Sequence, residues 1–328
     1  MNRTVYFFSP LMIFLLFSSL HSETIREDED ILWGLKLLYK EKLLDTVGQE
    51  DQVSPLSGKI LRKISELEQY WNKIDETWND FLEKKLLFNE EGQHIKSIYY
   101  GFEGKKKFQI GIDELLYDEL GQNINLTQKR DLIEDDNIAI DNYKQYIFEY
   151  GYNGKISEEQ LKMYRAGAWN NVRKTDFSYN EHGDLKEMYT YKWSNGKWTL
   201  AEHHTFTYDD AMTLLEELIE EYFLDQVFST HYIVHSYNEE GQLEKSVKHT
   251  GVIGSWKMNQ YTDYKYNLKG LLNQRMLKKF KKGAWLNEIA FLYVYDRQSN
   301  LNKIYEKVWS DKDGWVDLKR TVYTYKRM

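Results

Sequence analysis

The sequence predicts an all-β protein made of tandem 29-residue β-hairpin repeats that form a long antiparallel meander sheet. Three observations predict this fold: an aromatic residue recurs at a nearly constant spacing, glycines follow it at fixed distances, and the chain holds 26 Tyr and 10 Trp but only 2 Pro. Tyr and Trp favour strands, whereas Pro interrupts the hydrogen-bonded ladder of a central strand. We expect about sixteen to eighteen strands in one domain, at two strands per repeat.

Residues 1–22 have the features of a secretory signal peptide. Arg3 precedes an apolar run from Leu11 to Phe17, and small or polar residues follow up to Ser22. This run is too short to span a bilayer, and the strongly acidic stretch that begins at Glu23 argues against a buried strand. We therefore expect an exported protein that has no membrane span after the signal is removed.

The chain contains no cysteine. Disulfides, thiolate metal sites and a cysteine nucleophile are therefore excluded, and stability must come from burial and strand pairing. Export without cysteine is typical of a bacterial envelope, so we expect a secreted, periplasmic or cell-surface location. The net charge of −8 makes nucleic acid and anionic membranes poor partners.

Residues 23–53 are predicted to form a helical cap and linker. Ile31, Leu35, Leu38 and Leu43 give this region an apolar stripe with helical spacing. We expect it to cover the open edge of the first strand, because an unpaired edge is a template for aggregation.

The repeat array is predicted to span residues 54–328. An aromatic anchor recurs along it, mostly every 29 residues, and another aromatic residue often lies two positions before it, which is the period of a strand. The anchors are Phe88, Tyr117, Tyr150, Tyr179, Tyr208, Tyr237, Tyr266, Tyr295 and Tyr325.

A polar tetrad that usually ends in Gly follows each anchor and predicts a hairpin turn, in which Gly takes the residue with positive φ. A second strand then begins at Leu or Ile, six residues past the anchor. The residues that define this structural pattern most clearly are Tyr150, Gly154, Tyr179, Gly183, Tyr208, Tyr237, Gly241, Tyr266, Gly270 and Tyr295.

A second turn closes each unit, and a tryptophan just beyond it opens the strand that leads to the next anchor. Exposed aromatic faces can stack on sugars or bind a partner protein, although packing of a thin sheet explains the same regularity. The candidate ligand-stacking residues are Trp169, Trp198, Trp256, Trp285 and Trp315.

Two segments combine strand and helix patterns. In the divergent first repeat, 54–88, Ile60, Ile64 and Leu67 have helical spacing, yet Trp78 lies ten residues before Phe88, as in the regular repeats. In the degenerate repeat, 208–237, leucines also have helical spacing, and the turn Gly and the Trp are both missing. Because the 29-residue count is preserved there, we interpret both segments as strands.

Motifs of catalysis are absent from the sequence. It contains no phosphate-binding loop, dinucleotide fingerprint, nucleophile elbow or zinc-protease motif. Several histidines fall within residues 203–249, but alternating polar strand positions explain them more simply than a metal site does. We predict no enzyme, no cofactor and no metal.

The units of Tyr followed by Asp or Asn, two residues, Gly, one residue and Leu resemble the YD or Rhs-type repeats of exported bacterial proteins. They also resemble the Tyr/Gly/Trp hairpin repeats of uncharacterised secreted Bacteroidetes proteins. Tyr117, Tyr208 and Tyr295 are followed by Asp itself. The resemblance covers about residues 78–328 and implies an extracellular β-repeat scaffold that contacts carbohydrate or cell surfaces. This unit is longer than the usual YD unit and has an added Gly-x-Trp turn.

The sequence therefore predicts a non-catalytic binding or scaffold protein, whose partner is a polysaccharide or a surface protein. Exposed edge strands would also permit self-association. One alternative is an outer-membrane β-barrel, although charged residues such as Lys186 and Glu187 interrupt both faces of the strand that follows Asp184. Another alternative is a glycan-acting hydrolase, for which the sequence indicates no carboxylate pair.

Overall fold

The computed structural model describes residues 61–134, 137–252 and 255–327, and Lys63–Lys326 form one compact unit. The predicted signal peptide and the predicted helical cap lie outside the described residues. The described residues contain no helix long and apolar enough to cross a membrane.

Eighteen antiparallel strands form a single sheet, in agreement with the predicted hairpin meander. The strands are β1 (Leu61–Asn72), β2 (Thr77–Phe88), β3 (His94–Glu103), β4 (Lys106–Tyr117), β5 (Asn123–Glu134), β6 (Asn137–Tyr150), β7 (Ile156–Arg165), β8 (Ala168–Tyr179), β9 (Leu185–Ser194), β10 (Lys197–Tyr208), β11 (Leu214–Phe223), β12 (Gln226–Tyr237), β13 (Leu243–Val252), β14 (Ser255–Tyr266), β15 (Leu272–Lys281), β16 (Ala284–Tyr295), β17 (Leu301–Ser310) and β18 (Gly314–Arg327). Both segments with mixed patterns are strands where the structure describes them.

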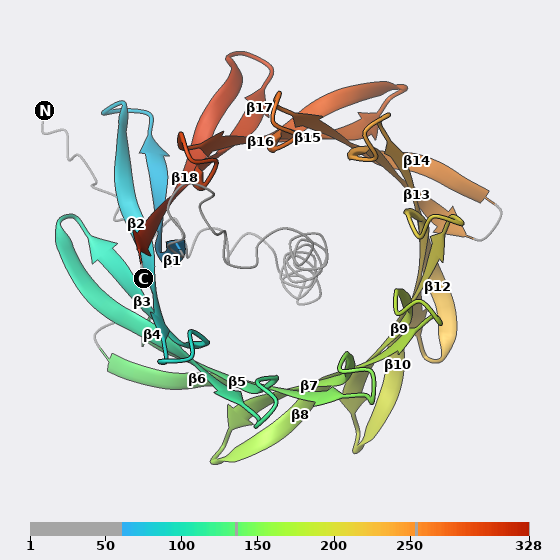
Figure 1. Ribbon diagram of the computed structural model, residues 1–328, viewed down its shortest axis with the longest axis horizontal. Coiled ribbons are helices and arrows are strands. Elements are labelled where there is room, and N and C mark those ends of the chain that lie inside the picture. The colour runs from blue at the N-terminus through green and yellow to red at the C-terminus, as the bar shows by residue number, and fades with distance from the viewer. Residues whose placement is uncertain (1–60, 135–136, 253–254, 328) are drawn as a thin grey trace, which may run out of the picture. The chain divides into compact units, whose positions relative to one another are not determined.

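The sheet closes into a barrel, so the prediction of an open sheet with exposed edges was wrong. Strand β1 pairs with β18, and the two meet in the ring of Figure 1. The Arg320 Nε donates to Oε1 of Gln69 at 2.6 Å, and the Lys319 ammonium lies 3.7 Å from the Glu68 carboxylate. The strand edge through which self-association was expected is therefore occupied by the chain itself.

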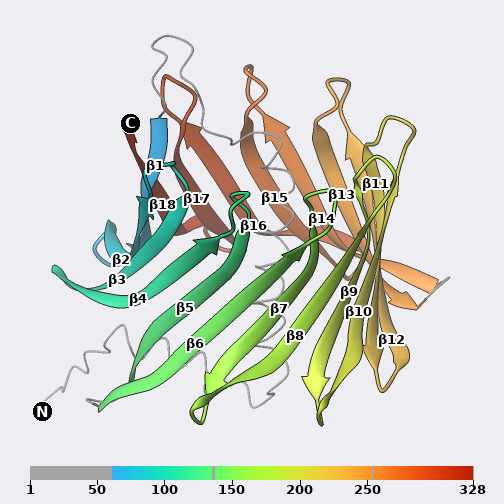
Figure 2. The ribbon, with the colours of Figure 1, turned by 60° about the horizontal axis from the view of Figure 1, so that its bottom comes forward.

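Regular bulges give a physical reason for this closure. Every strand pair whose register is described has one shift, for example between Leu161 and Lys162 in β7–β8 and between Ser178 and Tyr179 in β8–β9. A bulge bends its strand and increases the local twist. Two bulges in each repeat therefore add curvature in the same sense from hairpin to hairpin, and Figure 2 shows these hairpins side by side along the near wall.

The anchor tyrosines fasten each hairpin at the end where the longer turns lie. Each hydroxyl donates to the carbonyl oxygen of the residue that opens the preceding strand, at 2.6–2.9 Å, which explains why this position is Tyr rather than Phe. The pairs are Tyr117 with His94, Tyr150 with Asn123, Tyr179 with Ile156, Tyr208 with Leu185, Tyr237 with Leu214, Tyr266 with Leu243, Tyr295 with Leu272, and Tyr325 with Leu301.

The turn after each anchor has a repeated geometry. In one example, Oδ1 of Asn180 accepts hydrogen bonds from the backbone N–H groups of His182 and Asp184, and Gly183 has a φ of 87°. In the degenerate repeat, Met212 occupies the Gly position at a φ of 63°. Its backbone N–H donates to the carbonyl oxygen of Asp209 at 3.0 Å, as the N–H of Gly183 does to that of Asn180. The turn geometry thus survives without Gly, at a conformational cost.

Most fully buried strand residues share one face of the sheet. Thr175 lies opposite Thr190, and His204 lies opposite Ile219, and all four are buried. Side chains converge on the concave face of a closed sheet and shield one another, so we assign this as the inner face of the barrel. Few large apolar side chains are fully buried there, and the inner face is instead rich in hydrogen-bonded polar groups.

Candidate binding surface

Aromatic pairs occupy the other end of the barrel, beside the short turns. The tryptophan that opens an even-numbered strand lies directly opposite an aromatic residue of the preceding strand, because the turn between them is tight. The directly opposed pairs, with the distances between their ring centroids, are Trp71–Trp78 (5.2 Å), Tyr164–Trp169 (5.5 Å), Trp193–Trp198 (4.9 Å), Phe280–Trp285 (5.1 Å) and Trp309–Trp315 (5.2 Å).

Most of these rings meet edge to face, a geometry that contributes about 0.5–1.5 kcal/mol per pair beyond the area it buries. Three of the indoles nevertheless remain well exposed: Trp169 at 38%, Trp193 at 38% and Trp309 at 39%. The pairs therefore stabilise the hairpins and also present aromatic surface to solvent.

Trp256 is the exception among the five predicted stacking residues. It lies opposite Gly251 and stacks instead on Tyr232 of strand β12, with centroids 4.9 Å apart and ring planes 17° apart. Its Nε1 donates to the hydroxyl of Thr230 at 2.8 Å. A Cβ on Gly251 would lie 2.4 Å from the carbonyl oxygen of Ser255, so only Gly fits opposite this indole. Contacts with Tyr232 and Thr230 therefore fix the Trp256 indole against the wall.

The degenerate repeat presents an apolar hairpin tip in place of an aromatic pair. Phe223, Leu224, Val227 and Phe228 are between 42% and 77% exposed. Leu224 and Asp225 both have positive φ, which is the geometry of a two-residue hairpin turn, here formed without Gly. The loss of Gly and Trp from the sequence therefore changes the surface while the hairpin is retained.

Four of the histidines from residues 203–249 form hydrogen-bonded pairs with carboxylates or hydroxyls, and His249 pairs with the backbone carbonyl oxygen of Tyr232 at 3.3 Å. His204, which is 1% exposed, lies 3.0 Å from Glu217 and 3.2 Å from Glu202. His231 lies 3.2 Å from Glu221, and its hydrogen bond is the largest influence that lowers the pKa of that carboxyl group. Within the described residues, no group of three or more such side chains is arranged to hold a metal ion.

Charged side chains lie on both faces of the strands. On the inner face, Arg173 bonds Glu159 at 2.7 Å, with both side chains largely buried. On the opposite face, Lys174 lies 3.0 Å from Asp176 and 5.0 Å from the ring centroid of Tyr191. Neither face of this part of the wall is an uninterrupted apolar surface.

The sequence missed the aromatic partners on the odd-numbered strands. Trp193 and Trp309 are as exposed as Trp169, which was predicted, whereas Trp198, Trp285 and Trp315 are less exposed. Counting outward from the short turn gives the signal that finds them, since positions equidistant from a two-residue turn face each other.

No protein-family model matches this chain, and no curated protein matches it either. The resemblance to YD or Rhs-type repeats therefore stays a prediction. Among solved structures, the chain is similar to a porin-like protein from Bacteroides uniformis, with 11% identity, a TM-score of 0.43, and coverage of 80% of this chain and 98% of the other.

A second porin-like protein, from Bacteroides vulgatus, is also similar, with 11% identity, a TM-score of 0.34, and coverage of 79% of this chain and 97% of the other. A protein of unknown function from Bacteroides fragilis has 16% identity and a TM-score of 0.25, and the match covers 46% of this chain and 92% of that one. At these identities and TM-scores, no function is carried over from them.

Proposed function

We propose that this chain is a barrel protein of the bacterial cell envelope that acts by binding a ligand at its surface. The observation that carries the proposal is the closed ring, in which β1 pairs with β18, together with half-exposed tryptophans at one end of the wall. A closed ring leaves no strand edge free for pairing, so recognition falls to side chains. The predicted signal peptide supports the envelope location.

The charges of the wall favour a barrel that is surrounded by water. A strand that faces lipid needs an apolar outer row, and a Lys or Arg at the bilayer midplane costs about 2–4 kcal/mol. Lys174, Glu158 and Asp176 form ion pairs on the face opposite the inner one, and Lys278 and Asp263 form another at 3.1 Å. These contacts lie within the strands, where a bilayer-spanning barrel would present its apolar band.

An outer-membrane barrel is the second candidate, and closure favours it over the open scaffold that the sequence predicted. An even number of antiparallel strands joined by tight turns is the architecture of such barrels. A pore or channel protein of this kind would place the wall in lipid and pass solutes through it. This candidate requires the charged wall to be tolerated in the hydrocarbon layer.

One partition experiment separates the two candidates. The full chain is expressed with its own leader, and the envelope fraction is extracted first with high salt and alkali and then with detergent. We expect the folded chain to remain soluble without detergent and to stay outside added phosphatidylethanolamine vesicles. Extraction by detergent alone, together with spontaneous insertion into those vesicles, would replace this proposal with the outer-membrane barrel.

A further inference from the structure

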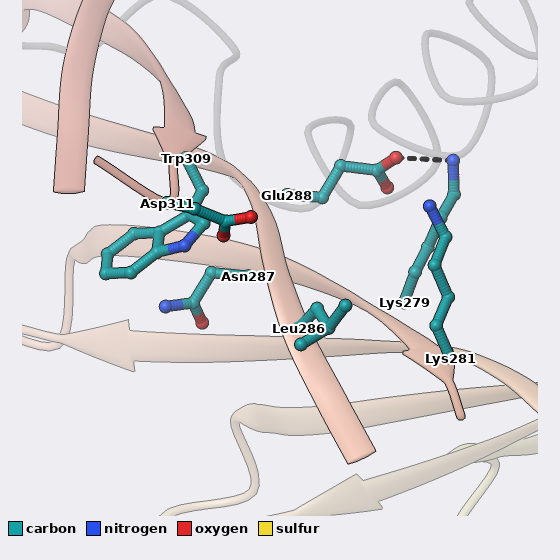
Figure 3. Close-up of a pocket in the computed structure, with 7 residues that line it drawn as sticks. All are labelled: Lys279, Lys281, Leu286, Asn287, Glu288, Trp309 and Asp311. Carbon is teal, nitrogen blue, oxygen red and sulfur yellow. Dashed lines mark ion pairs between the residues drawn. The ribbon is translucent and has the colours of Figure 1, made fainter. Parts of the chain in front are cut away.

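A small cavity lies between two neighbouring hairpins at the end of the barrel where the short turns lie. It has a volume of about 160 Å³ and is lined from strands β15 and β16 and from the end of β17 (Figure 3). Its lining residues are Lys279, Lys281, Leu286, Asn287, Glu288, Trp309 and Asp311. A cavity of about 150 Å³ holds a benzene ring, so this space accommodates one six-membered ring.

The lining combines one aromatic face with several hydrogen-bonding groups. Figure 3 shows the Trp309 indole beside the Asn287 amide, with the Asp311 carboxylate near the same ring. Trp309 is 39% exposed, although it also packs edge to face on Trp315. Pockets that bind small polar molecules use this division, in which an apolar surface gives area and a few polar groups fix the orientation.

The charges of the cavity balance, and one acceptor has no partner. Lys279 forms an ion pair with Glu288, while Lys281 and Asp311 contribute one charge of each sign. The second oxygen of Glu288, Oε2, is buried and accepts no hydrogen bond from any described residue. The Glu288 carboxylate extends toward Lys279 and away from Trp309 and Asn287 (Figure 3), so it lies outside the surface that these two residues form. The balanced charges of the lining fit a neutral ligand that carries hydroxyl groups.

The same pair of residues occurs a second time in the array. Trp193 and Asn171 lie four 29-residue periods before Trp309 and Asn287, at equivalent positions of β9 and β8. Trp193 is 38% exposed and packs edge to face on Trp198, as Trp309 does on Trp315. Asn195 takes the position of Asp311 in this copy, whereas Val172 takes that of Glu288, so the indole, the amide and one polar group are kept and the carboxylate of Glu288 is not.

We propose that Trp309 with Asn287, and Trp193 with Asn171, form two related subsites that each bind one pyranose ring of a neutral saccharide. The indole stacks on the C–H face of the sugar, and the asparagine amide bonds to ring hydroxyls. The two subsites deepen the binding function proposed above and rest on it. Because each subsite is built between two hairpins, the sites depend on the correct stacking of neighbouring repeats.

Titration calorimetry of the mature chain with cellotriose, chitotriose and maltotriose tests the proposal. We expect one of these trisaccharides to bind with a stoichiometry of about two per chain. Trp309→Ala and Trp193→Ala should each reduce the stoichiometry to about one, and the double variant should abolish binding. Asn287→Ala leaves both aromatic pairs intact and should weaken its own subsite about tenfold.

Phe81→Ala is the matched control, because Phe81 is an aromatic residue of strand β2 that is 43% exposed and lines neither subsite. Circular dichroism of every variant verifies that the barrel remains folded. Unchanged stoichiometry in the folded tryptophan variants, unchanged affinity in Asn287→Ala, or equal loss of binding in Phe81→Ala would overturn the proposal. Absence of binding to all three sugars would also overturn it while leaving the detergent-free barrel, measured on the same sample, in place.

Discussion

The tyrosine hydroxyls that fasten the hairpins give the most direct test of how this barrel is held together. Tyr266 ends strand β14, and its hydroxyl donates to the carbonyl oxygen of Leu243 at 2.8 Å. Burial raises the pKa of Tyr266 to about 12, with smaller contributions from Tyr264 and Tyr237. Replacing Tyr266 by Phe removes the hydroxyl and leaves the ring in place, so the change isolates one hydrogen bond.

The expected cost follows from the lost bond and from the carbonyl that is left without this donor. A neutral hydrogen bond contributes about 0.5–1.5 kcal/mol, and an unsatisfied buried acceptor adds to the loss, so we expect the free energy of unfolding to fall by about 1–2 kcal/mol. For a domain of this size, that corresponds to a decrease in Tm of about 2–4 °C.

Thermal denaturation followed by circular dichroism measures this difference. Tyr152→Phe is the control, because Tyr152 is a fully exposed turn residue in the same array. We expect its Tm to match that of the parent chain. If Tyr266→Phe melts together with Tyr152→Phe, the hydroxyls do not fasten the hairpins, and the preference for Tyr at the anchor needs another explanation.

The remaining predictions concern backbone strain, closure and pH. Met212→Gly should stabilise the chain by about 1 kcal/mol, because Gly adopts the positive φ of this position without strain. Gly241→Ala should destabilise the chain by a similar amount, because its φ is 76° and no atom lies near the added Cβ to compensate. Denaturant unfolding measures both changes, and a loss of stability in Met212→Gly would show that the methionine side chain contributes by packing. Arg320→Ala should lower the free energy of unfolding by about 1–3 kcal/mol, because the guanidinium bonds Gln69 and lies 4.6 Å from the Trp78 ring centroid where the barrel closes. Arg297→Ala is the control and should change stability little, because Arg297 is exposed. Equal unfolding midpoints of the two variants in urea would contradict the closure. Because burial raises the pKa of Tyr266 from 10.0 to about 12, the contribution of its hydroxyl to stability should be fully present below pH 10 and should be lost as the pH rises toward 12. If the free energy of unfolding of Tyr266→Phe falls with pH as steeply as that of the parent chain, Tyr266 is not a source of this pH dependence.

The repeat explains how much of this structure the sequence predicts. The spacing of the anchors, the polar tetrads and the second turns predicts antiparallel hairpins, and strands β11 and β12 form even where Met212 and Val227 replace Gly and Trp. Each of these features is local, because a hairpin forms between residues that are close in the chain. Pattern and turn chemistry therefore specify the hairpin almost completely.

From the sequence we named one tryptophan of each aromatic pair beside the proposed subsites and missed the other. Trp198 and Trp315 were identified from their place after the turn, but the more exposed Trp193 and Trp309 were not, because they lie outside the motif that defined the repeat. Which of two facing rings remains open to solvent depends on neighbouring strands, so the motif alone does not rank them. The pairing of Trp309 with Asn287 in one cavity also requires two hairpins to stack side by side.

The sequence by itself determined the strands, their antiparallel order and the type of turn between them, since these depend on residues a few positions apart. Only the tertiary structure decided that the sheet closes and which side chains face solvent. Closure depends on small bends that accumulate over eighteen strands until Arg320 and Lys319 meet Gln69 and Glu68. A single bulge leaves no clear mark in the sequence, and its effect on shape appears only when every repeat adds its curvature to the next.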